Sequence, residues 1–324
     1  MRTLHAKEYT EKNVFLNEAS QIFRKEWVPI AHTSEFQEQE YAIERRFIDF
    51  SVILVRDHNT FRAFHNVCAH RAGPLLWERE CSAVKALRCR YHGWRYDLLG
   101  SCTHKPDFGA EIEASLHSIH IKIWNGLIFI NISETPSAFH WSKLLDTHAP
   151  SLLSFVFHRT ASHQISCNWK TYVENYLEGY HIPYLHPSLR SSIQMSQYKI
   201  HCHDTLITHE VPTKEESEVS GFWAYLWPLT ALNMYGSSMS IERINPIDEQ
   251  TTEIHYIYLS KPNTSLEERE AAIAMSKQVT EEDILICNTV AKNLRSGVYS
   301  KGALSPKHEL GIHHMYSLRE KALI

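Results

Sequence analysis

Two short stretches of the chain each combine one cysteine with one histidine. One residue separates Cys68 from His70, and two residues separate Cys89 from His92. Four such side chains could hold a zinc ion or an iron–sulfur cluster. Zinc fingers usually place their two cysteines together, whereas here each half contributes one cysteine and one histidine. The arrangement favours a binuclear cluster, with both thiolates on one iron and both imidazoles on the other, over zinc.

A second candidate site lies in "ENYLEGYHIPYLHP", which contains His181 and His186. The chain has 22 histidines and the spacing His-x4-His recurs elsewhere, so the spacing alone is weak evidence. On an ideal helix these two side chains would point about 140° apart. Pro183 lies between them and is expected to break the helix there. The two imidazoles could then converge on one metal ion.

Two imidazoles need a carboxylate to complete the open facial triad of non-haem iron(II) enzymes. A long helix near the C-terminus offers Glu281, Glu282 and Asp283. Its apolar stripe is expected to contain Met275, Val279, Ile286, Val290 and Leu294. Asp283 falls nearest the centre of this stripe, Glu282 lies on its other side, and Glu281 points away. We therefore expect Asp283 to be the third ligand; the alternatives are Glu282 as the ligand or a stripe edge that faces solvent.

The elements that must position these side chains fall into contrasting parts. A helix is predicted over residues 8–26, and short β-rich runs separated by turns follow from 28 to 133. Residues 134–163 have the character of a linker, punctuated by Pro136 and Pro150. Strands such as "FWAYLWPL", "MSIERINP" and "TEIHYIYLS" then indicate a larger sheet, and a long helix spans about Ser265 to Arg295. The sequence predicts an α+β protein with segments 1–27, 28–133 and 134–324.

Composition excludes several classes of function. The formal net charge is −4 and no long basic run occurs, so we expect no nucleic-acid partner. The N-terminus is polar and no apolar stretch approaches about 20 residues, so neither a secretory signal nor a membrane span is expected. Five cysteines lack ligand-like spacing: Cys81, Cys102, Cys167, Cys202 and Cys287. Reduced thiols in the cytoplasm are the expectation.

The flanking residues carry a family resemblance. "CAHRAG" and "CRYHGWRYDLLG" resemble the Rieske signature of ring-hydroxylating oxygenases. "NWKTYVENYLEGYHIPYLHP" resembles the mononuclear-iron motif of Rieske non-haem iron oxygenase α-subunits, and the segment after residue 281 resembles the choline, glycine betaine and carnitine monooxygenase branch. The resemblance implies an N-terminal all-β Rieske [2Fe-2S] domain and a C-terminal helix-grip domain, an antiparallel sheet around a long helix.

The resemblance also implies a mechanism and partners. A separate NAD(P)H-dependent flavin or ferredoxin reductase would supply electrons to the cluster of Cys68, His70, Cys89 and His92. These would reach mononuclear Fe(II), where O2 and a small-molecule substrate react. The family forms head-to-tail homotrimers in which the cluster of one subunit serves the iron of its neighbour. Glu178 matches the bridging acid, which would bond a mononuclear-site histidine and, across the interface, His92. Asn175 matches a residue near the metal.

The substrate is less defined by the sequence. Trp223, Tyr225 and Trp227 alternate along one predicted strand and could line an aromatic pocket, although ordinary core packing is the plainer interpretation. Such a pocket suits a methylated amine of the betaine type, and it would also accept an aromatic ring. The alternative function is a Rieske electron-transfer protein with a non-catalytic ligand-binding domain, which would not need His181, His186 and Asp283.

Overall fold

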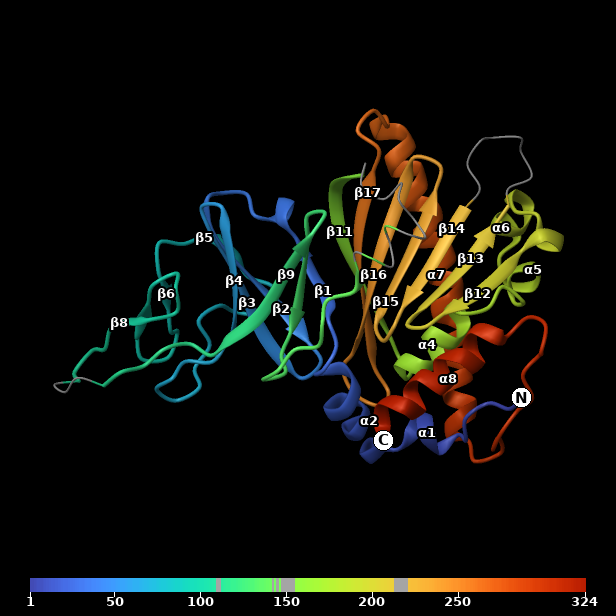
Figure 1. Cartoon of the computed structure of the whole chain (residues 1–324), viewed down its shortest axis with the longest axis horizontal. Helices are drawn as coiled ribbons and strands as arrows, with labels where there is room; N and C mark the ends of the chain where they lie inside the picture. Colours follow the sequence, from blue (N-terminus) through green and yellow to red (C-terminus); the bar gives the residue numbers. More distant parts are fainter. Residues whose placement is uncertain (109–111, 142, 144–145, 147–154, 213–220) are drawn as a thin grey trace. The chain divides into compact units, whose positions relative to one another are not determined.

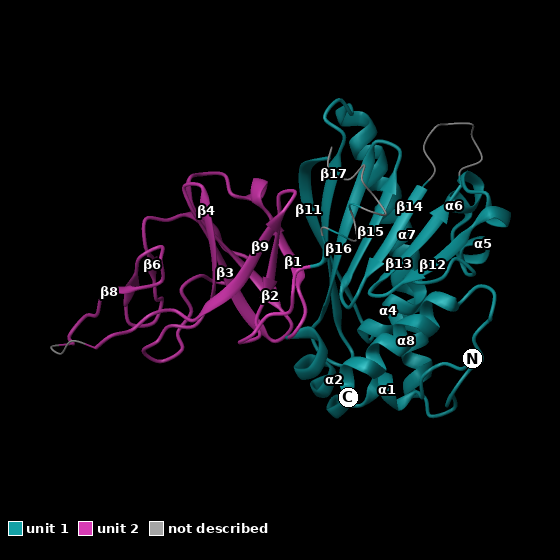
Figure 2. Ribbon diagram, in the orientation of Figure 1, with its two compact units in different colours: residues 1–24, 140–324 teal, residues 25–139 magenta. Residues whose placement is uncertain are grey.

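The computed structural model describes residues 1–108, 112–141, 143, 146, 155–212 and 221–324. The chain divides into two compact units, coloured separately in Figure 2: residues 25–139, and residues 1–24 together with 140–324. Residues 1–24 thus belong to the later unit, whereas the sequence analysis treated 1–27 as a separate segment. Pro150 lies outside the described residues. In the part of the chain that the structure describes, no helix is long and apolar enough to cross a membrane.

The unit of residues 25–139 is built on strands. Its larger sheet has the order β1-β10-β9-β4-β3-β2-β5. The strands are β1 (Val28–His32), β2 (Glu40–Phe47), β3 (Phe50–Asp57), β4 (Thr60–His65), β5 (Cys81–Ala83), β9 (Ser118–Trp124) and β10 (Leu127–Asn131). Four consecutive residues of β3, 52–55, are buried, so this central strand packs on both faces.

A small second sheet in the same unit joins β6 (Leu87–Arg88), β7 (Arg95–Tyr96) and β8 (Cys102–His104). The loop between β4 and β5 carries Cys68 and His70, and the β6–β7 turn carries Cys89 and His92. These two loops meet, because the backbone N–H of Arg90 donates to the carbonyl of Pro74, while within the first loop the N–H of Cys68 donates to the carbonyl of Gly73. The fold therefore brings the two cysteine–histidine pairs to one place.

The other unit contains a seven-stranded antiparallel sheet with the order β11-β17-β16-β15-β14-β13-β12 (Figure 1). The strands are β11 (Val156–Ile165), β12 (Lys199–His203), β13 (Leu206–Val211), β14 (Gly221–Leu226), β15 (Thr230–Tyr235), β16 (Ser238–Pro246) and β17 (Thr252–Ser260). Strands β12 to β17 each pair with the next strand in sequence, so they form a meander. Strand β11 pairs with β17 and is the edge strand on that side of the sheet.

Helices of this unit accompany the sheet. They are α4 (Trp169–Tyr176), α5 (Ile182–Leu185), α6 (Pro187–Ser192), α7 (Leu266–Arg295) and α8 (Leu310–Leu323). Ser265 caps α7 and forms the capping box with Glu268, as the sequence predicts. Helix α7 packs against α4 and β11. The predicted α+β class, an all-β part followed by an antiparallel sheet with a long helix, is confirmed.

Three local predictions were wrong. The first concerns residues 8–26, which form α1 (Lys7–Thr10), α2 (Lys12–Glu18) and a π-helical turn, Ala19–Phe23. The break occurs because Glu11 has extended backbone angles, φ −87° and ψ 123°.

The second correction concerns Pro183. Helix α4 already ends at Tyr176, and Pro183 lies in the first turn of α5, where its missing N–H is not needed. The break comes earlier, where the Glu178 carboxylate accepts the backbone N–H groups of Tyr180 and His181. A local side-chain bond competes with the helix there.

The third correction concerns the buried face of α7. Its buried residues are Ile273, Thr280, Cys287 and Ala291. Three members of the predicted stripe are instead more than one-third exposed: Met275 (36%), Ile286 (37%) and Val290 (38%). A polar residue belongs to the buried face because Thr280 Oγ1 bonds Tyr256 Oη on β17 at 2.9 Å.

A buried ionic cluster ties both ends of the chain to α4. Lys170 Nζ lies 2.8 Å from Glu18 Oε2, and Arg319 Nε lies 2.5 Å from Glu18 Oε1. The side chains of Glu18 and Lys170 are both 0% exposed. Glu18 therefore compensates two buried cations, one from α4 and one from α8.

Candidate functional site

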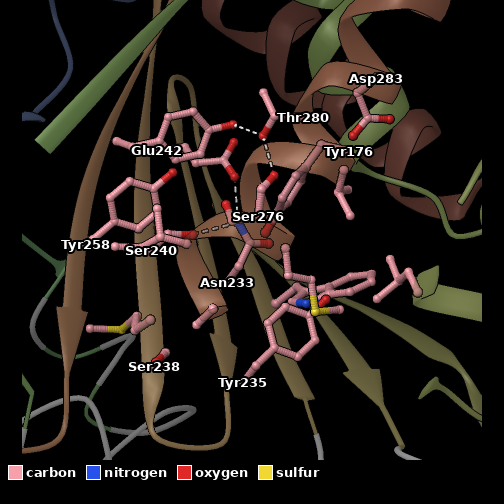
Figure 3. Close-up of a pocket in the computed structure, with 18 of the residues that line it drawn as sticks. Tyr176, Asn233, Tyr235, Ser238, Ser240, Glu242, Tyr258, Ser276, Thr280 and Asp283 are labelled. Carbon is pink, nitrogen blue, oxygen red and sulfur yellow. Dashed lines mark hydrogen bonds between the residues drawn. The ribbon is translucent and has the colours of Figure 1, made fainter. Parts of the chain in front are cut away.

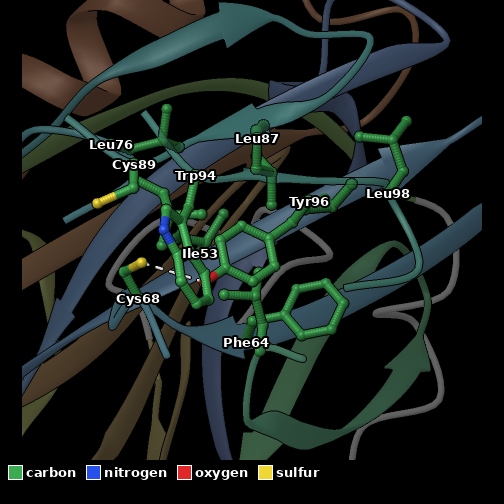
Figure 4. Close-up of a cluster of buried hydrophobic side chains, with 13 residues drawn as sticks. Ile53, Phe64, Cys68, Leu76, Leu87, Cys89, Trp94, Tyr96 and Leu98 are labelled. Carbon is green, nitrogen blue, oxygen red and sulfur yellow. Dashed lines mark hydrogen bonds between the residues drawn. The ribbon is translucent and has the colours of Figure 1, made fainter. Parts of the chain in front are cut away.

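The two cysteine–histidine loops form one compact group in the unit of residues 25–139. Cys68 and Cys89 are buried in an apolar cluster with Trp94 and Tyr96, drawn in Figure 4. Both thiols are free. The rings of His70 and His92 lie 4.6 Å apart, and His92 is exposed. The loops thus gather two thiols and two imidazoles with one imidazole at the surface.

These residues fit an iron–sulfur cluster. Among the described residues, buried Nδ1 of His70 has no hydrogen-bond partner, so a ligand such as iron would satisfy it. The His70 ring stacks on Trp94 at 4.9 Å, which fixes its orientation. A Cβ at Gly73 would lie 2.9 Å from Cys89 Sγ, so only glycine allows the loop backbone this close to the thiol.

Tyr96 connects the loop backbone to one thiol. Its hydroxyl accepts the N–H of Ala69 at 3.1 Å and lies 3.1 Å from Cys68 Sγ (Figure 4). Because the oxygen accepts from Ala69, its proton is directed at the sulfur. A hydrogen bond of this kind stabilises negative charge on a metal-bound thiolate.

The second site combines three ligand atoms from distant parts of the sequence. One ligand atom each from His181, His186 and Asp283 lie within 4.8 Å of one another. Nε2 of His186 is 3.1 Å and Nε2 of His181 is 3.8 Å from Asp283 Oδ1. Two neutral imidazoles and one carboxylate form the donor set of a facial triad. The residues therefore fit a mononuclear iron(II) ion.

Short local elements aim both imidazoles at Asp283. His181 and His186 flank the single turn of α5, so the two rings meet edge to face at 5.1 Å. Nδ1 of His181 lies 2.5 Å from Glu178 Oε1, and Nδ1 of His186 lies 2.6 Å from Glu282 Oε2. Each imidazole thus uses Nδ1 for a carboxylate and presents Nε2 to the metal position.

The structure also places the two remaining predicted site residues. Asn175 Nδ2 donates to Asp283 Oδ1 at 2.7 Å, which orients that carboxylate. Glu178 is buried and contacts His181 within the chain. The sequence indicates Glu282 only as an alternative ligand and does not predict its bond to His186. Its position beside Asp283 gave no signal for that bond, because the pairing depends on how α5 meets α7.

A pocket lined by both histidines and Asp283 lies between the sheet and α7 (Figure 3). Aromatic side chains form part of its walls, namely Tyr172, Tyr176, Trp223, Tyr235, Tyr256 and Tyr258. The pocket hypothesis for the strand residues holds for Trp223, whereas the plainer interpretation of core packing holds for Tyr225 and Trp227. Tyr225 is fully buried with its hydroxyl on the carbonyl of Pro228, and the Trp227 ring packs 6.3 Å from Trp169 of α4. Both side chains therefore belong to the protein core.

One acidic side chain of this pocket was missed. Glu242 lies on β16, is 5% exposed, and accepts hydrogen bonds from Tyr172 Oη at 2.7 Å and Asn233 Nδ2 at 2.6 Å. Burial raises the pKa of Glu242 to about 7, and the hydrogen bonds from Tyr172 and Asn233 oppose this shift. A glutamate at the centre of the apolar run "MSIERINP" was the signal available in the sequence.

Comparison with known proteins identifies the family. Residues 26–122 match the model of the Rieske [2Fe-2S] domain. Residues 152–209 and 207–321 match the ring hydroxylating alpha subunit (catalytic domain), which covers slightly more than half of the chain. The chain belongs to the ring-hydroxylating α-subunit family. Its cofactors are a Rieske [2Fe-2S] cluster and a mononuclear iron, as the resemblance implied.

Full-length relatives support this assignment. The carnitine monooxygenase oxygenase subunit of Escherichia coli K12 is 29% identical, over 98% of this chain and 92% of the relative. The chloroplastic choline monooxygenase of Arabidopsis thaliana is 26% identical, over 96% and 80%. A solved quaternary ammonium Rieske monooxygenase, CntA, has a TM-score of 0.89 at 24% identity, over 100% and 96% of the chains. Naphthalene 1,2-dioxygenase has a TM-score of 0.79 at 17% identity, over 99% and 92%.

The Rieske α-subunit is accordingly the terminal oxygenase of a system that receives electrons from a separate reductase. It uses O2 to hydroxylate a small organic molecule. The alternative of an electron carrier with a non-catalytic domain is not supported, because the catalytic-domain model extends over the residues that gather His181, His186 and Asp283.

Proposed function

We propose that this oxygenase hydroxylates a C–H bond next to the nitrogen of a small quaternary ammonium compound. The observation that carries the proposal is the pocket, in which His181, His186 and Asp283 share one cavity with a wall of tyrosine and tryptophan rings. Aromatic faces attract quaternary ammonium groups. The carnitine and choline monooxygenases among the relatives act on compounds of this class.

We assign the cofactor ligands to the residues that the geometry gathers. Cys68, His70, Cys89 and His92 would hold the cluster. A separate group, His181, His186 and Asp283, would hold the mononuclear iron. When bound, these centres supply electron transfer and activation of O2. Around them, Glu178, Glu282 and Asn175 orient the ligands, and the aromatic walls position the substrate and limit the access of water.

The overall reaction has a defined balance. One O2, two electrons and two protons convert an N–CH3 group into N–CH2OH and water. The N–C bond of this product then breaks, giving formaldehyde, a tertiary amine and a proton. Hydroxylation of a chain carbon next to nitrogen would instead release a longer aldehyde and a trimethylated amine. The products therefore identify the carbon that reacts.

We also propose that the cluster of one subunit serves the iron of another in a head-to-tail homotrimer. His92 is exposed in the one unit, and Tyr180 and Tyr184 beside the mononuclear site are 50% and 83% exposed in the other. Such exposed groups suit a contact with a second subunit, where Glu178 would bridge His181 and His92. The solved CntA oxygenase is described as revealing inter-subunit electron transfer.

The predicted cytoplasmic location stays a prediction. Free thiols at all seven cysteines suit a reducing compartment.

The test of function combines the holoenzyme with an NADH-dependent reductase, O2 and single candidate substrates. Choline, glycine betaine and carnitine represent quaternary ammonium compounds, and naphthalene represents arenes. We expect oxygen uptake coupled to release of formaldehyde or trimethylamine with at least one ammonium compound and no diol from naphthalene. Oxidation of the arene alone would refute the proposed substrate class.

The trimer proposal has its own test. A Cys68→Ser variant lacks a cluster ligand, and an Asp283→Ala variant lacks a ligand of the mononuclear iron. Each alone is expected to be inactive. Co-expression should restore part of the activity, because a mixed trimer pairs an intact cluster with an intact iron site across one interface. No restoration in a demonstrated mixed oligomer would show that electrons do not cross between subunits.

A further inference from the structure

The pocket holds a carboxylate that the reaction described above does not use. Glu242 projects from β16 into the cavity, where Figure 3 shows it beside Asn233 and facing Tyr176. Its two oxygens accept one hydrogen bond each, from Tyr172 and from Asn233. A carboxylate oxygen has two acceptor positions, so each oxygen keeps one free.

No cation of the described chain compensates this acid. Its polar partners in the described residues, Tyr172 and Asn233, are uncharged, and the charged neighbour that acts on it is another acid, Asp283. The contrast with Glu18 is direct, because that buried carboxylate lies against both Lys170 and Arg319. An ionised acid buried without a counter-ion is costly, so a cation that enters the cavity would relieve the cost.

The surroundings of Glu242 suit an organic cation better than a metal ion. The Glu242 side chain lines the same pocket as four tyrosines, Tyr172, Tyr176, Tyr235 and Tyr256. A metal would need several oxygen or nitrogen ligands at one point, whereas a quaternary ammonium group needs aromatic faces and one diffuse negative charge.

A series of hydroxyl contacts connects Glu242 on β16 to α7, the helix that carries Asp283. Tyr172 Oη, which bonds Glu242, lies 3.3 Å from Tyr256 Oη, and that hydroxyl bonds Thr280 Oγ1. Thr280 precedes Asp283 by about one helical turn, roughly 4.5 Å along the axis. Glu242 and the candidate ligand Asp283 line the same pocket, and the charge of Asp283 acts on the Glu242 carboxyl, so an ammonium group held beside Glu242 would share one cavity with the mononuclear site.

We propose that Glu242 is the counter-ion that selects a positively charged substrate in this pocket. The inference rests on the proposed function and deepens it. Charge recognition would come from one carboxylate on β16, while the aromatic walls supply shape and apolar contact. Substrates that carry a carbon atom in place of the charged nitrogen would be rejected through the loss of this single interaction.

The experiment measures binding to the oxidised, iron-loaded enzyme by calorimetry, without reductase, so that no turnover occurs. The first probe pair is choline and the uncharged alcohol in which a tert-butyl group replaces the trimethylammonium group. The second is glycine betaine and the acid altered in the same way. We expect the wild type to prefer the ammonium member of at least one pair, and Glu242→Gln to reduce that preference about 10- to 100-fold. The affinity for the uncharged member should change little.

Glu174→Gln is the matched control. Burial raises the pKa of Glu174, like that of Glu242, to about 7, and two hydroxyls, those of Tyr9 and Tyr316, donate to it, but it does not line the pocket. This variant should keep the preference. Glu242→Asp, which retains the charge one methylene further back, should lose only part of it and serves if the glutamine variant does not fold.

Three results would overturn the inference: a wild type without preference for charge, an unchanged preference in Glu242→Gln, or an equal loss in Glu174→Gln. The proposed function is judged separately, by whether wild-type enzyme with reductase releases formaldehyde or trimethylamine. An enzyme that demethylates ammonium compounds but retains its preference without Glu242 would refute this inference alone.

Discussion

Nδ1 of His186 lies 2.6 Å from Oε2 of Glu282, a residue of α7 that is 96 positions later in the chain. The bond fixes which nitrogen of the imidazole carries the proton and turns Nε2 toward Asp283, 3.1 Å away. Adjacent residues of α7 thus have different tasks. Asp283 supplies a ligand atom, while Glu282 orients the neighbouring ligand.

Replacing Glu282 by alanine should weaken iron retention about 10- to 100-fold, because His186 would lose the partner that fixes its orientation. The measurement is the mononuclear iron left after dialysis against a graded chelator. Glu281→Ala is the control, since Glu281 is 60% exposed and pairs with the exposed Lys277. Equal iron retention by the two variants would contradict the role of Glu282.

Replacing Asp283 by alanine should abolish substrate oxidation and mononuclear iron binding. The visible spectrum of the cluster should remain, because its ligands lie in the other compact unit. Iron analysis, absorption spectroscopy and oxygen uptake check the three expectations. Normal oxidation by this variant would exclude Asp283 from the metal site.

Replacing Tyr96 by phenylalanine should lower the reduction potential of the cluster by about 40 to 60 mV, the equivalent of one hydrogen bond to sulfur in a one-electron couple. The lost donor otherwise stabilises the additional negative charge of the reduced state. Redox titration of the visible spectrum measures the shift. Tyr91→Phe, at an exposed position, should leave the potential unchanged, and a similar shift in both variants would remove the special role of Tyr96.

Replacing Lys170 by methionine should destabilise the protein by roughly 2 to 4 kcal/mol, because the buried Glu18 would lose a cationic partner and keep Arg319 and the indole N–H of Trp169. Urea unfolding followed by tryptophan fluorescence measures the loss. Lys277→Met should change stability by about 0.5 kcal/mol or less, since the Lys277–Glu281 pair is 61% and 60% exposed. Comparable losses would show that the buried cluster contributes little.

Burial lowers the pKa of His209 from 6.5 to about 3. The unfolded chain therefore binds a proton near pH 6.5 while the folded protein does not, so unfolding becomes easier as the pH falls from 6.5 toward 3. His209→Gln should remove about 2 kcal/mol of the loss that wild type shows between pH 7 and pH 5. The exposed His120→Gln should preserve the wild-type dependence. Parallel pH curves for wild type and His209→Gln would reject the assignment.

The structure brings together the side chains that the sequence groups as candidate ligands. The pairs Cys68–His70 and Cys89–His92 need only two loops to meet. One ligand atom each of His181, His186 and Asp283 lie within 4.8 Å of one another in the structure. Their assignment as ligands stays a prediction. The sequence also located the cap of α7 at Ser265, since a capping box depends on neighbouring residues alone.

Features that depend on partners distant in sequence were not predictable. The buried face of α7 includes polar Thr280 because Tyr256 lies opposite it, so hydrophobic periodicity indicated the wrong stripe. Alternation along β14 indicates that Trp223 faces the pocket, which is the case. Trp227 follows directly after β14, and its ring packs against Trp169 instead. The role of Glu242 in the pocket was not predictable, because its partners Tyr172 and Asn233 come from a helix and another strand.

The order of the compact units along the chain bears on how the polypeptide matures during translation. Residues 25–139 are continuous, so they can acquire their own structure as soon as they leave the ribosome. Glu18 emerges earlier but must wait for Lys170 and Arg319, which are both synthesised after residues 25–139. A nascent chain that stalls before residue 310 would contain all of residues 25–139 and could fold this unit. It would lack Arg319, so helices α1 and α2 would be without the cation that binds Glu8 and Glu18.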